Sequence, residues 1–252
     1  MNAEVGRRVF VGSVVAGLPF LAALPALAQR GATAGHTHAA DRADPVLDLL
    51  VRQMARTHNA AAQTTPRAEH FRALAAQLRT LALYERQLGV DEQIRAAVKE
   101  LVDRDGRNAV LYATPDVEMR RRNLQTYGFR LPVRGREPAV FPSHQQREDV
   151  LDDLLERGIT PAFDQMAAVA DRVALRIDAS RARGLVFQQS DQEWWQAYCA
   201  EVWAQYEQAQ QIANPVCIVA KYWPGFVPSC IALEGGAAVL LLAYLFDCPI
   251  YA

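Results

Sequence analysis

Apolar residues recur every three or four positions through most of the chain after residue 43, which is the spacing that places them on one face of an α-helix. Helix starts and stops delimit the periodic stretches 44–61, 65–89, 91–106, 114–128, 143–158, 160–177 and 190–214. Two runs resemble strands, Leu185 to Phe187 and Cys217 to Ala220, and both are too short to build a sheet. The pattern predicts an all-α multi-helix bundle of about seven to eight helices.

Capping residues sharpen several of these boundaries. Thr-Pro pairs at 65, 114 and 160 and the pair Asp44-Pro45 are typical helix starts. Ser143 and Ser190 each begin a capping box, and Gly89, Gly106 and Gly158 are the predicted stops. We expect the helix that follows Ser190 to end at Asn214-Pro215, because proline removes a helical hydrogen bond.

The chain divides at a segment without apolar periodicity. Residues 129–142 contain three prolines, a glycine and several arginines, which indicates a linker or surface loop. We therefore expect an N-terminal helical part at 44–128 and a C-terminal helical part at 143–252.

The first residues have the three-part plan of a secretory signal: Arg7-Arg8, an apolar run, and the small-residue pattern Ala26-Leu27-Ala28. The paired arginines resemble the twin-arginine export signature. We expect a signal peptide at 1–28, cleaved near Ala28, a flexible arm at 29–43, and a periplasmic or extracellular protein. The alternative is a retained membrane anchor, since about 20 apolar residues can span a bilayer.

Four cysteines, Cys199, Cys217, Cys230 and Cys248, all lie in the C-terminal part. An even number in an exported protein favours disulfides, with three possible pairings. We favour Cys217 with Cys230, which closes a turn-rich loop, and Cys199 with Cys248, which ties down the tail. A four-thiolate metal site is the alternative, but there is no Cys-x-x-Cys pair, and we predict no metal site.

Candidate chemistry is sparse. Asp103 to Asn108 resembles the start of an EF-hand calcium loop, but Arg107 and Thr114 stand where ligands are needed. His36 and His38 would hold a metal only weakly, and His58 and His70 lack the Glu three residues earlier that a di-iron helix carries. The motifs of serine hydrolases, phosphate loops and haem attachment are missing from the sequence.

Two clusters suggest a binding surface. Arg120, Arg121 and Arg122 concentrate positive charge near the linker, where they would either dock an anionic partner or be solvated. Trp194 and Trp195 are adjacent and cannot both face one core, so with Trp223 they offer either a stacking surface or packing against the C-terminal segment. These six residues form the candidate binding surface.

The segment from Gly235 to Phe246 is apolar and uncharged. As a helix it would be about 18 Å long, short of the roughly 30 Å hydrocarbon core, so we expect a buried central helix; membrane insertion or partner docking is the alternative.

The net charge of −1 gives no general attraction to nucleic acid. The leading hypothesis is a non-enzymatic envelope protein that binds another envelope protein or a glycan. One alternative is an enzyme of unrecognised type using His58, His70 and nearby carboxylates, whose cofactor the sequence leaves open. The other is a membrane-associating protein that uses residues 235–246.

Overall fold

The computed structural model describes residues 43–63, 67–113, 117–130, 142–183 and 190–248, which form helices and their connections and contain no strand. The prediction of an all-α bundle is confirmed. The nine α-helices of these residues are α2 (Pro45–Gln63), α3 (Ala68–Leu88), α4 (Val90–Asp105), α5 (Arg107–Tyr112), α6 (Val117–Thr126), α7 (His144–Arg157), α8 (Thr160–Arg183), α9 (Ser190–Tyr222) and α10 (Val227–Asp247). The predicted leader and most of the arm lie outside the described residues.

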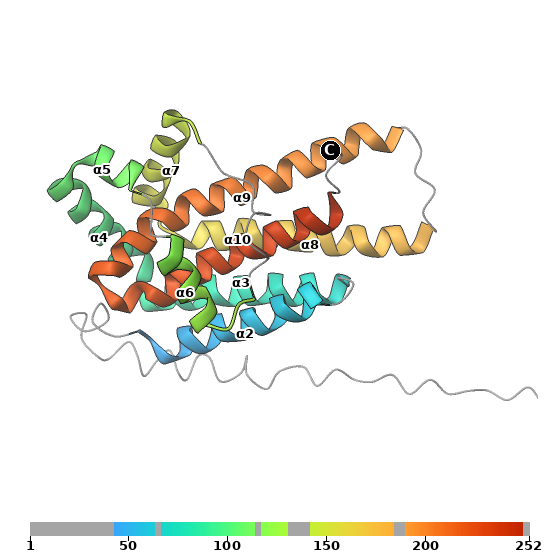
Figure 1. Cartoon of the computed structure of the whole chain (residues 1–252), viewed down its shortest axis with the longest axis horizontal. Helices are drawn as coiled ribbons and strands as arrows, with labels where there is room; N and C mark the ends of the chain where they lie inside the picture. The colour runs from blue at the N-terminus through green and yellow to red at the C-terminus, as the bar shows by residue number, and fades with distance from the viewer. Residues whose placement is uncertain (1–42, 64–66, 114–116, 131–141, 184–189, 249–252) are drawn as a thin grey trace, which may run out of the picture. The chain divides into compact units, whose positions relative to one another are not determined.

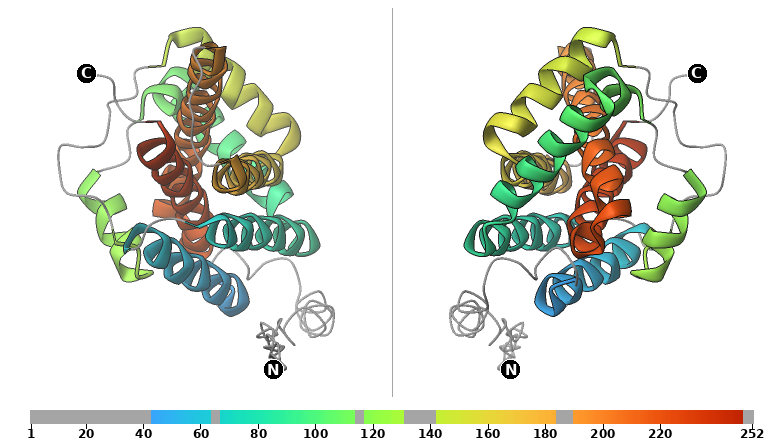
Figure 2. Two further views of the ribbon diagram at one scale, coloured as in Figure 1. Left: turned by 90° about the vertical axis from the view of Figure 1, so that its right-hand side faces the viewer. Right: turned by 90° about the vertical axis from the view of Figure 1, so that its left-hand side faces the viewer.

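The apolar helix α10 occupies the middle of the bundle, and α2, α3, α8 and α9 all contact it (Figures 1 and 2). Helices from before and after the proline-rich segment therefore share one core. Two glycines allow the close packing. A Cβ on Gly235 would lie 2.5 Å from the Phe129 ring, and one on Gly236 would lie 2.5 Å from the Met166 sulfur. A larger residue at either position would require these neighbouring side chains to move.

The buried central helix is longer than predicted. α10 has 21 residues and begins at Val227, whereas the sequence pattern indicated only 235–246. Pro228 stands in the first turn, where proline is tolerated because its missing N–H has no helical partner there.

Several predicted boundaries are confirmed. The Ser143 hydroxyl accepts a hydrogen bond from the Gln146 backbone N–H at 3.2 Å, and the Gln146 side chain accepts one from Ser143 N–H at 2.8 Å. Gly89 ends α3 with φ 65°, in the left-handed region that favours glycine. α8 begins at Thr160 as expected, while the Thr-Pro pairs at 65 and 114 fall outside the described residues.

One predicted boundary is wrong. α9 does not stop at Asn214-Pro215 but continues through Pro215 to Tyr222, so the strand-like run Cys217 to Ala220 is helical. Val216, Cys217 and Val219 are all buried, and α9 packs along α10. Burial of these side chains offsets the hydrogen bond that Pro215 removes. The other strand-like run, Leu185 to Phe187, lies outside the described residues.

Candidate binding surface

A short turn joins α9 to α10, which pack along each other in the C-terminal part. α9 ends at Tyr222, a 3-10 turn covers Pro224–Phe226, and α10 follows at once. Phe226 is buried and anchors the turn, whereas Tyr222 is 54% exposed. We call Lys221, Tyr222, Trp223 and Pro224, together with the neighbouring Arg104, the aromatic turn.

A disulfide closes the base of the aromatic turn. Cys217 on α9 and Cys230 on α10 are bonded, with their Cα atoms 4.8 Å apart. A second disulfide joins Cys199 to Cys248 and fixes the end of α10 to α9. The favoured pairing is therefore the one the structure contains. Cys217 and Cys230 are 1% and 2% exposed, so an outside thiol has no direct access to them in this state.

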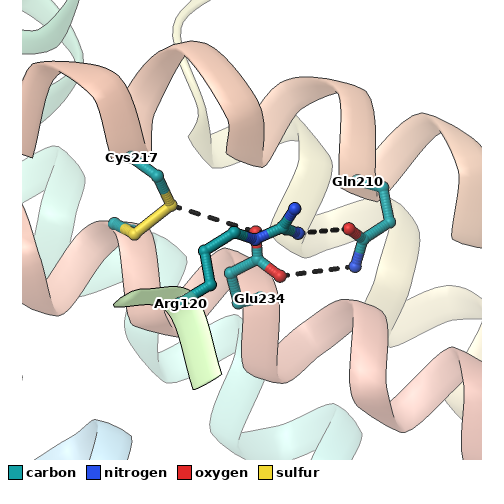
Figure 3. The surroundings of a disulfide bond; sticks show 5 residues. Arg120, Gln210, Cys217 and Glu234 are labelled. Atoms are coloured by element: carbon teal, nitrogen blue, oxygen red, sulfur yellow. Dashed lines mark hydrogen bonds and ion pairs between the residues drawn. A yellow bond between two sulfur atoms is a disulfide. The ribbon is translucent and has the colours of Figure 1, made fainter. Parts of the chain in front are cut away.

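A buried ion pair lies beside this disulfide (Figure 3). Arg120 of α6 pairs with Glu234 of α10 and also donates to the Gln210 amide oxygen, while Gln210 Nε2 donates to Glu234 Oε2 at 3.4 Å. Glu234 Oε1 lies 3.9 Å from the Cys217 sulfur. Both carboxylate oxygens are engaged and the two charges cancel. The cluster therefore holds α6 on the α9–α10 pair and offers no free reactive group.

Three aromatic and basic side chains meet on the outside of the turn. The Arg104 guanidinium lies 4.7 Å from the centroid of the Tyr222 ring, and the Tyr222 and Trp223 rings meet edge to face with centroids 5.9 Å apart. Asp105 accepts two hydrogen bonds from Arg104, at 2.8 and 2.7 Å, and this bonding raises the pKa of Arg104. Arg104, Tyr222 and Lys221 are exposed, and Trp223 is half-buried. The aromatic turn is thus an exposed aromatic surface beside Lys221, and the charge of Arg104 within it is paired with that of Asp105.

The six residues of the predicted surface separate in the structure. Trp223 belongs to the aromatic turn, Arg122 is exposed and Arg121 is half-buried. Arg120 does not join a basic surface, because its side chain points inward to Glu234 and is only 17% exposed. The side chains of Trp194 and Trp195 lie outside the described part of the chain. Sequence reasoning missed Tyr222 and Arg104, although the position of Tyr222 beside Trp223 inside a cysteine-bracketed turn was a usable signal.

The two histidines of the enzyme hypothesis have separate partners. His58 is 4% exposed, its ring packs against Phe129, and burial lowers its pKa. His70 is at the start of α3, where its Nδ1 accepts a hydrogen bond from the Arg67 backbone N–H at 3.3 Å. Among the described residues, no group of three or more His, Cys, Asp or Glu side chains is arranged to hold a metal ion. His36 and His38 lie outside them.

Two other buried carboxyl groups, Asp91 on α4 and Glu85 on α3, contribute to the packing of helices. Asp91 Oδ1 accepts hydrogen bonds from the backbone N–H groups of Ile159 and Thr160, at 2.7 and 3.1 Å, so it caps α8. Glu85 is fully buried against α10, and burial raises its pKa to about 8, while the nearby Ser229 hydroxyl opposes the shift. A carboxyl with this pKa is mostly protonated at neutral pH. Neither group reaches the aromatic turn.

One cavity lies where α5, α7 and α9 meet. Its volume is about 20 Å³, and Arg147, Gln211, Asn214 and Pro215 are among its lining residues. A space of this size holds a single water molecule and excludes an organic substrate.

One helical stretch of the described residues, Pro224–Leu245, is long and apolar enough to cross a membrane, with a mean hydropathy of 1.9. Its apolar window is 83% buried inside the bundle. The expectation that this helix is too short to span a bilayer is therefore wrong. Contact with α2, α3, α8 and α9 buries α10 as a core helix. Comparison of the chain with protein-family models, with curated proteins and with solved structures found no match.

Proposed function

We propose that the protein is a non-enzymatic binding protein of the cell envelope and that the aromatic turn is its contact surface. The observation that carries this proposal is the exposure of Tyr222, with Arg104 over its ring, on a turn that a disulfide closes. Aromatic and arginine side chains supply most of the binding free energy at protein contact sites. A rigid turn loses little conformational entropy on binding, which favours affinity further.

The proposed location rests on two features of the chain. Both cysteine pairs are oxidised, and disulfides persist in oxidising compartments such as the periplasm. Residues 1–28 have the plan of a signal peptide with paired arginines. We propose export by the twin-arginine route and cleavage near Ala28, which the intact mass of the exported protein tests directly.

The partner should carry acidic groups next to a flat or apolar surface. Lys221 places an exposed positive charge next to Tyr222 and Trp223. The Arg104 guanidinium over the Tyr222 ring is already paired with Asp105. A glycan with acid groups, or an acidic patch on another envelope protein, meets both requirements.

Site-specific photo-crosslinking in cells tests the proposal. Tyr222 is replaced by the photoreactive analogue p-benzoylphenylalanine, and Gln63, an exposed residue at the C-terminal end of α2, serves as the matched control position. We expect a crosslinked product from position 222 that the control lacks and that Trp223→Ala diminishes. Protease treatment then separates a protein partner from a glycan. Equal yields from both positions would exclude the aromatic turn as the contact surface.

A membrane-associating role for α10 is the second candidate, because the helix is long enough to span a bilayer. It requires α10 to leave the bundle, against the two disulfides that join it to α9. Flotation of the exported protein with liposomes is the test. Protein that stays in the soluble fraction, with and without a reducing agent, rules this role out.

A further inference from the structure

A regular ladder of ion pairs follows the outer side of the α3–α8 pair. The two helices lie side by side along their length (Figure 1). Three arginines of α3 each pair with an aspartate of α8, and both series step by seven residues: Arg72 with Asp178, Arg79 with Asp171, and Arg86 with Asp164. A step of seven keeps each series on one side of its helix, so the face carries a positive stripe beside a negative one.

Apolar side chains lie between successive ion pairs along the two helices. Leu175 of α8 lies between the first and second pairs and Leu83 of α3 between the second and third, by their sequence positions. Leu175 is 64% exposed and Leu83 is 51% exposed, and Leu175 is the most exposed large apolar residue of the described chain. Ala76 and Ala168 continue the same stripes at the levels of Leu175 and Leu83. We call these ten residues the arginine–aspartate face.

Stability of the single chain does not explain this pattern. The charged side chains of the three pairs are between 37% and 51% exposed, and exposed ion pairs add little to folding free energy. A leucine that is more than half exposed adds less by burial than one in the core. An alternation of charge pairs and leucines over about 21 Å of helix has the composition of a coiled-coil contact instead.

We propose that the arginine–aspartate face binds a second copy of this chain, with a two-fold axis parallel to α3 and α8. In this arrangement α3 of each copy lies against α8 of the other. Every arginine then faces an aspartate of the second copy at the same height along the helices. Leu175 faces Ala76 of the second copy, and Leu83 faces Ala168. A two-fold axis across the helices would instead place arginine on arginine. The charges therefore select one of the two face-to-face arrangements.

The proposal is independent of the aromatic turn, which is built from other helices. It predicts a reversible dimer of modest affinity, because a face of this length lies at the small end of specific interfaces. Added salt should weaken the dimer, since the paired charges are exposed before association.

Sedimentation of the exported protein from about 1 to 500 µM tests for the dimer. We expect concentration-dependent dimerisation, and we expect Leu175→Arg to raise the dimer dissociation constant by about a hundredfold, because both copies lose a buried leucine and place a cation against the arginine stripe of the other copy. Leu49→Arg on α2 is the matched control, at a leucine that is 45% exposed and outside the face. A wild-type monomer throughout this range would overturn the proposal, as would a dimer that Leu175→Arg leaves unchanged.

A charge exchange tests the arrangement itself. The double variant Arg79→Asp/Asp171→Arg keeps an ion pair within each chain, and it remains complementary to another copy of itself. Mixed with wild type, it would set like charges against each other twice at the middle level of the face. Native mass spectrometry of the mixture should show both homodimers and about tenfold fewer mixed dimers than random exchange gives. Random exchange would overturn the proposed axis.

Discussion

The α9–α10 pair and the α3–α8 pair are both antiparallel helix pairs, but they are held together by different interactions. The α9–α10 pair has two disulfides and the buried ion pair between Glu234 and Arg120. The α3–α8 pair has exposed ion pairs along its outer side. In Figure 2, α10 lies in the interior while α8 lies at one side of the bundle.

The difference separates stabilising interactions from recognition. A buried charge must be paired, so Arg120 is indispensable to Glu234, which is 3% exposed. Exposed charges are solvated with or without a partner. The ion pairs between α3 and α8 are therefore not needed for folding and can take part in association. The interior pair should therefore control folding, and the exterior pair should control the oligomeric state.

The largest effect should come from breaking the buried ion pair. Arg120→Met leaves the Glu234 carboxylate buried without its cation, and we expect a loss of about 3–5 kcal/mol in the free energy of unfolding. Denaturant unfolding measures this loss. The double variant Arg120→Met/Glu234→Gln should recover much of it, because no buried charge remains. A loss below about 1 kcal/mol for Arg120→Met would show that the pair is solvated.

Removing the disulfides should have the next largest effect. Replacement of Cys217 and Cys230 by serine should lower the free energy of unfolding by about 3 kcal/mol, and replacement of Cys199 and Cys248 by about 4 kcal/mol, because the second bond closes the longer loop. Guanidinium unfolding of each double variant checks the order. The reverse order would mean that the tail around Cys248 is already held without its bond.

Glu85, where α3 meets α10, should make stability depend on pH. Burial raises its pKa from 4.5 to about 8 in the folded protein, so the folded state holds this proton after the unfolded chain has released it. Its contribution is complete below pH 4.5 and is lost as the pH rises to about 8. Glu85→Gln should be more stable than wild type at pH 9, on the order of a few kcal/mol, and similar at pH 4. The same difference in unfolding free energy between Glu85→Gln and wild type at pH 4 and pH 9 would contradict this.

The smallest effect on folding should come from the ladder. Asp171→Asn removes the middle ion pair with Arg79, and we expect less than about 1 kcal/mol of change at a concentration where the protein is monomeric. Thermal unfolding of dilute protein measures it. A loss comparable to that of Arg120→Met would remove the contrast between the two helix pairs.

Local patterns predicted the helices well because apolar spacing and capping residues act over a few positions. Ser143 and Gly89 behave as their sequence context indicates. Pro215 does not, because the burial of Val216 and Val219 against α10 is a tertiary effect that outweighs a local preference.

The candidate site was predictable only in part. The Cys217–Cys230 pair and Trp223 lie within one turn-rich stretch, which a sequence displays directly, and the Cys199–Cys248 pair was favoured because it ties the tail to the preceding helix. The partners of Arg120 are 90 or more positions away, at Gln210 and Glu234, and nothing local reveals that contact. The ladder was detectable in principle, because Arg72, Arg79 and Arg86 repeat every seven residues, as do their aspartates, but the match between the two series depends on the packing of α3 against α8.

Disulfide mapping of the purified protein tests whether α9 and α10 are joined by the two disulfides. After thiol blocking, cleavage at glutamate and lysine places each cysteine in its own peptide: 194–201, 208–221, 222–234 and 235–252. We expect 208–221 to be bonded to 222–234 and 194–201 to 235–252, with no blocked thiol. Any other pairing, or four blocked thiols, would contradict it.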